Sequence, residues 1–118
     1  MKVAIKLSFL SVVCFFLLGI TNAFAQDDTK TETFKVYGNC GMCKETIEGA
    51  LKKKDGVMKK DWNKTTKMIT VTYDPSRITL KQIKQKIADV GYDSDEIHAT
   101  DEAYNHLHKC CHYERAKN

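Results

Sequence analysis

The chain has 118 residues, of which 42% are hydrophobic and 29% are charged, with a formal net charge of +4. This length limits it to one small domain with little core to spare. The charge is modest and the aromatic residues do not interleave with a basic stripe, so the composition argues against a nucleic-acid-binding protein.

Residues 1–25 have the pattern of a secretory signal peptide. Lys2 and Lys6 provide a positive start, residues 7–20 are almost wholly apolar, and a small-x-small cleavage signal ends at Ala25. We expect cleavage after this residue and export to the periplasm or the medium. The apolar run is too short to span a bilayer comfortably, so no stable membrane insertion is expected after cleavage.

Cleavage changes the cysteine inventory. Cys14 leaves with the leader, where the preceding residues lack the small side chains of a lipidation site. The remaining cysteines form two close pairs, Cys40 with Cys43 and Cys110 with Cys111. An even count in an exported chain usually indicates disulfides, but joining two neighbouring cysteines gives a strained ring. A disulfide that joins one pair to the other is still possible.

The first structured segments are a strand and a helix. Residues 26–31 are polar and predict a flexible leader, whereas residues 33–37 alternate as in a half-buried strand. After a loop, apolar residues recur at helical spacing from Cys43. Acidic residues lie early in this helix and lysines late, which suits the helix dipole, and Asp55 with Gly56 is expected to end it.

The rest of the domain is predicted to contain two strands, a second helix and a further extended segment. Residues 57–62 and 67–73 predict two strands, Thr79 caps a helix over residues 80–90, and a weaker extended segment lies near Ile97. The order is strand, helix, strand, strand, helix, strand. It predicts an α+β, ferredoxin-like βαββαβ fold, with two helices on one face of a four-stranded antiparallel sheet.

The motif Cys40-Gly41-Met42-Cys43 carries the main chemical signal. Cys40 lies in the loop and Cys43 at the helix start, where the helix dipole favours thiolates. Loop flexibility lets both sulfurs approach one soft ion. Two thiolates suit Cu(I), whereas Zn(II) prefers four ligands.

A thiol–disulfide oxidoreductase is the competing interpretation of this motif. However, no aromatic residue directly precedes Cys40, and the single proline, Pro75, does not open a strand opposite the dithiol. The sequence therefore predicts a binding protein rather than an enzyme.

Residues 100–118 form a C-terminal tail rich in cysteine and histidine. A short helix is expected over residues 101–108. The tail contains five candidate auxiliary metal ligands: His106, His108, Cys110, Cys111 and His112. The alternatives are a disordered tail or one held by a disulfide. His98 stands alone and is expected to be a surface residue.

Residues 32–98 resemble the heavy-metal-associated domain family, which includes copper chaperones, domains of metal-pumping ATPases and a periplasmic mercury-binding protein. We place this domain at residues 32–99. The resemblance is carried by five segments, at residues 38–43, 47–51, 56–57, 71–75 and 91–92.

The resemblance implies specific roles for residues near the dithiol. Cys40 and Cys43 would be the metal ligands, and Tyr92 would pack beside the metal loop. Gly38 stands where the family usually has a methionine. We expect Met42 to supply the missing apolar packing, and the alternative is an exposed thioether near the metal.

The family also indicates cargo and partners. Copper(I) is the favoured ion, with mercury(II), in a periplasmic scavenger, or zinc(II) as alternatives. The partner would be a metal-donor or acceptor protein such as an efflux pump or a metal-transporting ATPase. An exposed dithiol permits either a monomer or a metal-bridged dimer.

Overall fold

The computed structural model describes residues 28–117, so the signal peptide expected over residues 1–25 lies outside the described residues. Within them, no helix has the length and apolar character needed to cross a membrane. The main elements are β1 (Lys30–Lys35), α2 (Gly41–Gly49), β2 (Val57–Trp62), β3 (Met68–Tyr73), α3 (Leu80–Asp89) and α4 (Asp101–Asn105). Two 3-10 turns, Lys53–Asp55 and Lys109–Cys111, complete them.

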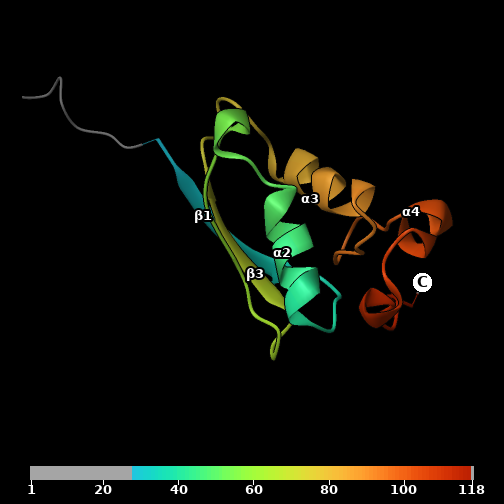
Figure 1. Cartoon of the computed structure of the whole chain (residues 1–118). Coiled ribbons are helices and arrows are strands. Elements are labelled where there is room, and N and C mark those ends of the chain that lie inside the picture. Colours follow the sequence, from blue (N-terminus) through green and yellow to red (C-terminus); the bar gives the residue numbers. More distant parts are fainter. Residues whose placement is uncertain (1–27, 118) are drawn as a thin grey trace, which may run out of the picture.

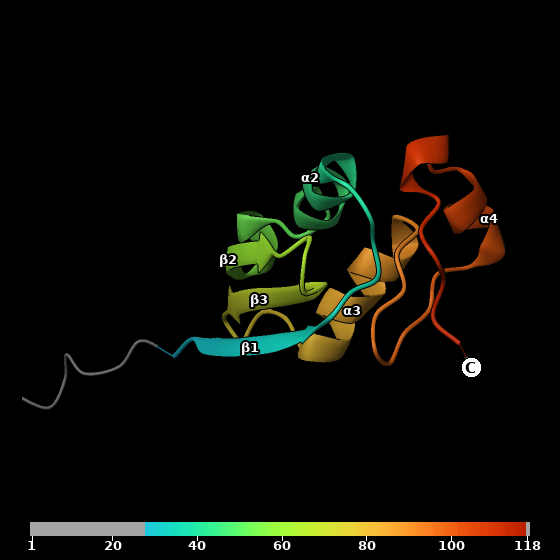
Figure 2. The ribbon, with the colours of Figure 1, turned by 90° about the horizontal axis from the view of Figure 1, so that it is seen from below.

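The strands form an antiparallel sheet in the order β1-β3-β2. Ile69 in the central strand pairs with Phe34 on one side and Trp62 on the other. Ile69, Val71 and Tyr73 alternate with less buried residues and point into the core, as their spacing predicts. Figure 2 shows α2 and α3 on the same side of this sheet.

Helix α3 follows its sequence signals closely. The Thr79 hydroxyl accepts from the backbone N–H of Gln82, and the Gln82 side chain accepts from the Thr79 N–H, which makes a reciprocal capping box. Ile83 and Ile87 are buried on the inner face. The predicted helix over residues 80–90 and its Thr79 cap are thus confirmed.

Helix α2 is shorter than predicted. It ends at Gly49, and the lysine-rich segment continues as the 3-10 turn Lys53–Asp55. Glycine has low helix propensity, and the backbone carbonyl of Leu51 accepts a hydrogen bond from the Lys60 ammonium. Gly56 then reverses the chain at φ +109°, with Arg77 and Ile78 so close that a side chain would be crowded.

The prediction of a fourth strand near Ile97 is wrong for the described residues. The segment makes only an isolated antiparallel bridge between Val36 and Ser94. Ser94 instead closes a turn, because its backbone N–H and hydroxyl both donate to the Ile97 carbonyl, at 2.9 and 3.2 Å. The buried Lys84 ammonium holds this turn through Asp95, 3.0 Å away. This turn and its ion pair with helix α3 replace strand pairing.

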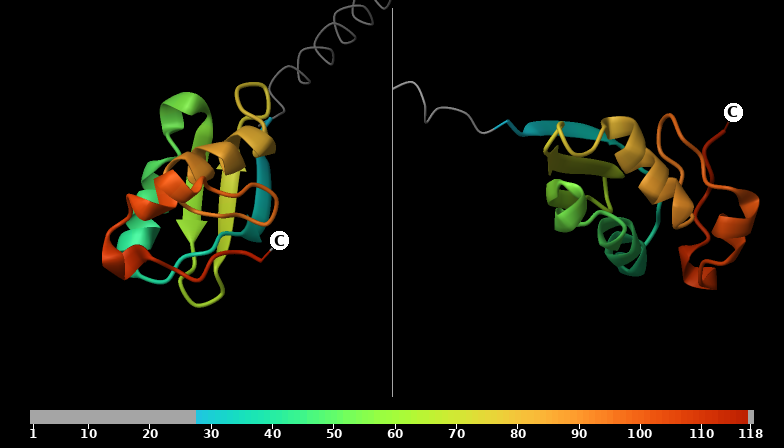
Figure 3. Two further views of the ribbon diagram at one scale, coloured as in Figure 1. Left: turned by 90° about the vertical axis from the view of Figure 1, so that its right-hand side faces the viewer. Right: turned by 90° about the horizontal axis from the view of Figure 1, so that it is seen from above.

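The C-terminal tail is a folded part of the molecule. Figures 1 and 3 show α4 and the following turn beside the helices, on the side away from the sheet. The helix α4 is shorter than the expected 101–108. Beyond it, Cys111 and Tyr113 belong to the same buried cluster as Cys43 and Tyr92. The tail therefore shares the hydrophobic core that lies under the dithiol loop.

Candidate metal centre

The dithiol lies at the start of helix α2. Cys40 occupies the N-cap position in an extended conformation, and its side chain makes no capping hydrogen bond. Cys43 lies in the first turn and is fully buried. Their sulfur atoms are 3.2 Å apart, and the Cys43 thiol donates to the side-chain oxygen of Asn39 at 3.1 Å. Both predicted ligand residues thus converge on one point.

Trp62 explains the glycine at position 38. A Cβ atom on Gly38 would lie 2.9 Å from the indole ring of Trp62, which is too close for a real contact. The indole is buried, and its N–H donates to the Val36 carbonyl at 2.9 Å. The ring therefore fills the space below the loop. Trp62 is thus a core residue, and its role under the loop could not be predicted from sequence spacing.

Met42 does not pack under the loop, so that prediction is wrong. Its side chain is 45% exposed, and its thioether sulfur lies 3.9 Å from the Cys110 sulfur. Because Trp62 already occupies the space below the loop, the methionine turns outward. The structure agrees with the alternative interpretation, an exposed thioether near the dithiol.

The tail brings two more thiols to the dithiol. The Cys111 sulfur lies 3.6 Å from that of Cys40 and 3.7 Å from that of Cys110. The sulfurs of Cys40, Cys110 and Cys111 all lie within 4.8 Å of one another, close enough to hold one ion. All four cysteines of the described chain are free thiols. The structure therefore gathers a cluster of thiols from two distant segments.

The histidines of the tail lie apart from this sulfur cluster. The ring of His112 stacks on Tyr104, with centroids 4.9 Å apart, and His106 Nδ1 lies 2.8 Å from the Glu102 carbonyl. His108 and His98 are exposed. Among residues 28–117, the group of close ligand atoms contains cysteines alone.

Tyr92 lies directly behind the sulfurs, as the family resemblance implies. It is fully buried, and its hydroxyl has no hydrogen-bond partner of normal geometry among the described residues. Burial and the neighbouring thiols of Cys43 and Cys111 raise the pKa of this hydroxyl above its usual range. Tyr92 therefore presents a neutral O–H to the site.

Aromatic and charged residues hold the tail in place. The rings of Tyr92 and Tyr113 stack with centroids 5.3 Å apart. The Tyr113 hydroxyl donates to the Gly91 carbonyl and accepts from the Asp93 N–H, at 2.8 and 2.9 Å. Two Arg115 nitrogens donate to the buried Asp93 carboxylate at 2.8 and 3.0 Å. These anchoring residues have no recognisable sequence motif.

The thiols differ in acidity. Burial works against ionisation of Cys40, but the nearby Cys43 thiol and the backbone N–H groups at the start of α2 stabilise the thiolate and outweigh it, so the pKa of Cys40 is lowered. Burial, assisted by the adjacent thiols, raises the pKa of Cys111 to about 12. Of these two thiols, Cys40 is therefore the one favoured as a thiolate.

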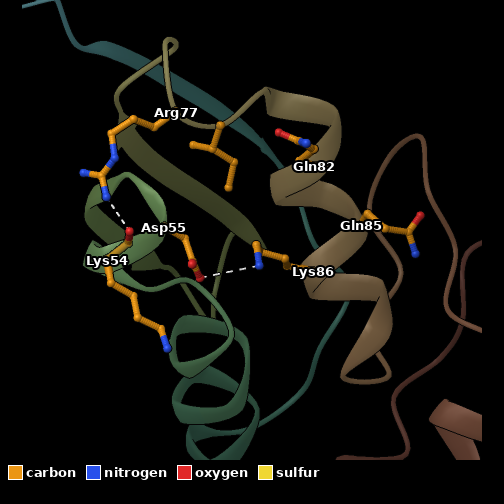
Figure 4. Close-up of a pocket in the computed structure, with 7 residues that line it drawn as sticks. Lys54, Asp55, Arg77, Gln82, Gln85 and Lys86 are labelled. Atoms are coloured by element: carbon orange, nitrogen blue, oxygen red, sulfur yellow. Dashed lines mark hydrogen bonds and ion pairs between the residues drawn. The ribbon is translucent and has the colours of Figure 1, made fainter.

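A surface cleft of about 620 Å³ lies elsewhere, between the 3-10 turn Lys53–Asp55 and α3. Figure 4 shows an ion pair between Lys86 and Asp55 and a hydrogen bond from Arg77 to the Lys54 carbonyl across it. Its lining residues include no cysteine or histidine. The cleft is therefore separate from the thiol cluster.

The fold and the dithiol together define a small metal-binding domain of the ferredoxin-like class. Residues 33–93 match the heavy-metal-associated domain family. The chain belongs to this family. The match ends before the tail, so the second pair of thiols lies outside the residues that match the family.

The chain is also similar to several named proteins. The copper chaperone CopZ of Staphylococcus aureus is 42% identical over 63 residues, which cover 52% of this chain and 93% of the relative. Oxidised MerP from Ralstonia metallidurans CH34 superposes with a TM-score of 0.53 at 34% identity, over 57% of this chain and 94% of MerP. The water-soluble region of the P-type ATPase CopA from Bacillus subtilis superposes with a TM-score of 0.55 at 31% identity. The superposition covers 59% of this chain and 47% of the CopA region.

Proposed function

We propose that this protein is an exported metal-binding protein that carries Cu(I) on Cys40 and Cys43. It either passes the ion to a partner or sequesters it. The observation that supports this most directly is the pair of free thiols 3.2 Å apart at the start of α2. The 42% sequence identity to a copper chaperone supports copper as the ion. Two soft thiolates are the ligands that Cu(I) accepts at low coordination number.

Transfer would proceed by exchange of thiolate ligands. An incoming thiol of the acceptor loses its proton and forms a sulfur–copper bond, and one of the two cysteine sulfurs then leaves the ion and takes up a proton. Copper remains Cu(I) throughout, so no oxidant or reductant is consumed. The lowered pKa of Cys40 favours its thiolate as the first captor of the ion.

The acceptor in this proposal is a metal-transporting ATPase or another efflux pump. The likeness to the soluble region of a P-type ATPase supports it, because donor and acceptor would then share the same fold. The structural likeness to MerP supports testing Hg(II) as an alternative cargo.

Native mass spectrometry with Cu(I), Zn(II) and Hg(II), under anaerobic reducing conditions, tests the cargo. We expect one Cu(I) per chain, retained while Zn(II) is lost to a mild chelator, because two thiolates satisfy copper better than zinc. The same spectra report metal-linked dimers. Failure to retain Cu(I), with stable binding of another ion, would overturn the assignment of copper.

Export is tested separately on the protein purified from expressing bacteria. We expect its first residue to be Gln26 and its location to be outside the cytoplasm, because cleavage follows Ala25. Replacing Ala25 with arginine should leave the leader attached, with serine at the same position as the permissive control. A wild-type chain that keeps Met1 in the cytoplasm would contradict export.

A further inference from the structure

The thiols and the thioether near the dithiol form a continuous series. Taken in the order Cys43, Cys40, Cys111, Cys110 and Met42, neighbouring sulfurs are separated by 3.2, 3.6, 3.7 and 3.9 Å. A two-ligand site needs only the first two. The remaining sulfurs come from the tail and from the exposed residue between the two cysteines.

The spacing around Cys40 suits a three-coordinate ion. Three sulfurs bound to one ion by bonds of about 2.3 Å lie about 4 Å apart in a trigonal plane. Cys40 already lies 3.2 Å from Cys43 and 3.6 Å from Cys111. Cys40 is therefore the sulfur that the dithiol shares with the tail, and both of its separations lie within a few tenths of an ångström to one ångström of the trigonal spacing.

Cys111 is held next to the dithiol by the fold. Its side chain is only 2% exposed, and two residues later Tyr113 is buried against Tyr92. Arg115 then forms a bidentate ion pair with Asp93. The stacked rings and this ion pair, in which Asp93 is buried, fix the tail beside the dithiol loop.

The hydroxyl of Tyr92 supports a role for Cys111 as a metal ligand. The Tyr92 hydroxyl is buried behind Cys43 and Cys111 and has no partner of normal geometry in the described chain. A thiolate at either position, once bound to metal, would accept a hydrogen bond from this O–H. Buried polar groups without partners are rare, so this one is an independent sign of a missing anionic species.

We propose that Cys111 is a third thiolate ligand of the ion held by Cys40 and Cys43, so that the docked tail closes the site. This inference rests on the proposed function. On binding, the Cys111 thiol releases its proton and forms a sulfur–metal bond, with no change of oxidation state. Cys110 and Met42 lie at the exposed edge, where an ion enters or leaves. Release to a partner then requires the bond to Cys111 to break, which favours retention of the ion.

X-ray absorption of the Cu(I)-loaded protein counts the sulfur ligands. We expect three sulfurs in wild-type protein and two in Cys111→Ser. We also expect Cu(I) affinity, measured against a chromophoric chelator, to fall by about 10- to 100-fold, at least the loss typical of outer-shell changes. Lys109→Ala, an exposed neighbour without a thiol, is the control and should keep three sulfurs. Cys110→Ser removes the other tail thiol of the sulfur group, and the inference requires a smaller loss of affinity than in Cys111→Ser. A wild-type site with two sulfurs, or equal effects of both substitutions, would overturn the inference.

Protease protection provides a second measurement if Cys111→Ser folds poorly. Lys109 is exposed, and trypsin can cut after it when the tail is free. Binding of Cu(I) to Cys111 should slow this cut about tenfold in wild-type protein, because the metal raises the cost of opening the tail. Equal rates with and without Cu(I) would count against the ligand role.

The two proposals fail in different ways. If wild-type protein binds no Cu(I), the proposed function is wrong. If it binds one Cu(I) through two sulfurs, the proposed function stands and only the role of Cys111 is wrong. Two ions per chain would place the tail thiols in a separate site, which also contradicts a shared ion.

Discussion

Replacing both Cys40 and Cys43 with serine is expected to remove tight Cu(I) binding. The hydroxyl keeps nearly the same size but is a hard ligand that stays protonated at neutral pH, and Cu(I) selects soft thiolates. Each lost ligand should cost at least the 10- to 100-fold typical of outer-shell partners, so the double variant should lose roughly 1,000-fold or more. Competition with a chromophoric Cu(I) chelator measures this.

Two controls make that experiment specific. Lys109→Ala replaces an exposed tail residue that has no thiol and should retain binding. Circular dichroism of the metal-free proteins should show that the double variant is folded, because Cys43 belongs to the core. Unchanged affinity in a folded double variant would move the main site to the tail.

The sequence predicted those parts of the fold that depend on local signals. Thr79 with Gln82 forms the expected cap, and Ile69, Val71 and Tyr73 face the core, because capping and alternation are properties of neighbouring residues. The convergence of Cys40 and Cys43 is local in the same sense, since three positions at a helix start bring two side chains together.

The parts that were missed depend on distant contacts. The fourth strand gave way to a turn at Ser94, which the buried Lys84 of helix α3 stabilises through Asp95. Met42 turned outward because Trp62, twenty positions further along, fills the space under the loop. No pattern within a short window of sequence contains either contact.

The tail shows the same limit most clearly at the site itself. Five candidate ligands could be identified from residue type, but the structure brings only Cys110 and Cys111 to the dithiol. Their selection depends on Tyr113 and Arg115, which fix where the chain crosses the loop. Residue type therefore predicts which side chains can bind a metal ion, and packing determines which of them lie beside the dithiol.

Replacing Asp93 with asparagine is expected to destabilise the protein by about 3 kcal/mol at neutral pH, because it breaks a buried charge pair. The carboxylate accepts from Arg115 and from the backbone N–H groups of Ala99 and Ala116. Asparagine has nearly the same shape, but its NH2 group is a donor and would face the N–H donors that the carboxylate now accepts from. Urea unfolding measures the loss, and trypsin cleavage after Lys109 reports whether the tail has opened.

The pH dependence identifies the charge as the cause. Burial works against ionisation of Asp93, but the hydrogen bonds from Arg115 and the two backbone N–H groups outweigh it and lower its pKa. A lowered pKa in the folded state stabilises the protein above the unfolded value of about 3.9. This contribution is lost as the pH falls through the lower, folded value. The difference between wild-type protein and Asp93→Asn should therefore shrink below about pH 4.

Asp61→Asn is the matched control, because Asp61 also pairs with a cation, Lys44, but its side chain is 82% exposed. Its unfolding midpoint should match that of wild-type protein at every pH, since exposed ion pairs contribute little. If both asparagine variants lose the same stability, the buried pair between Asp93 and Arg115 does not hold the tail. A loss confined to Asp93→Asn, accompanied by faster cleavage after Lys109, would show that one charge pair keeps Cys111 beside the dithiol.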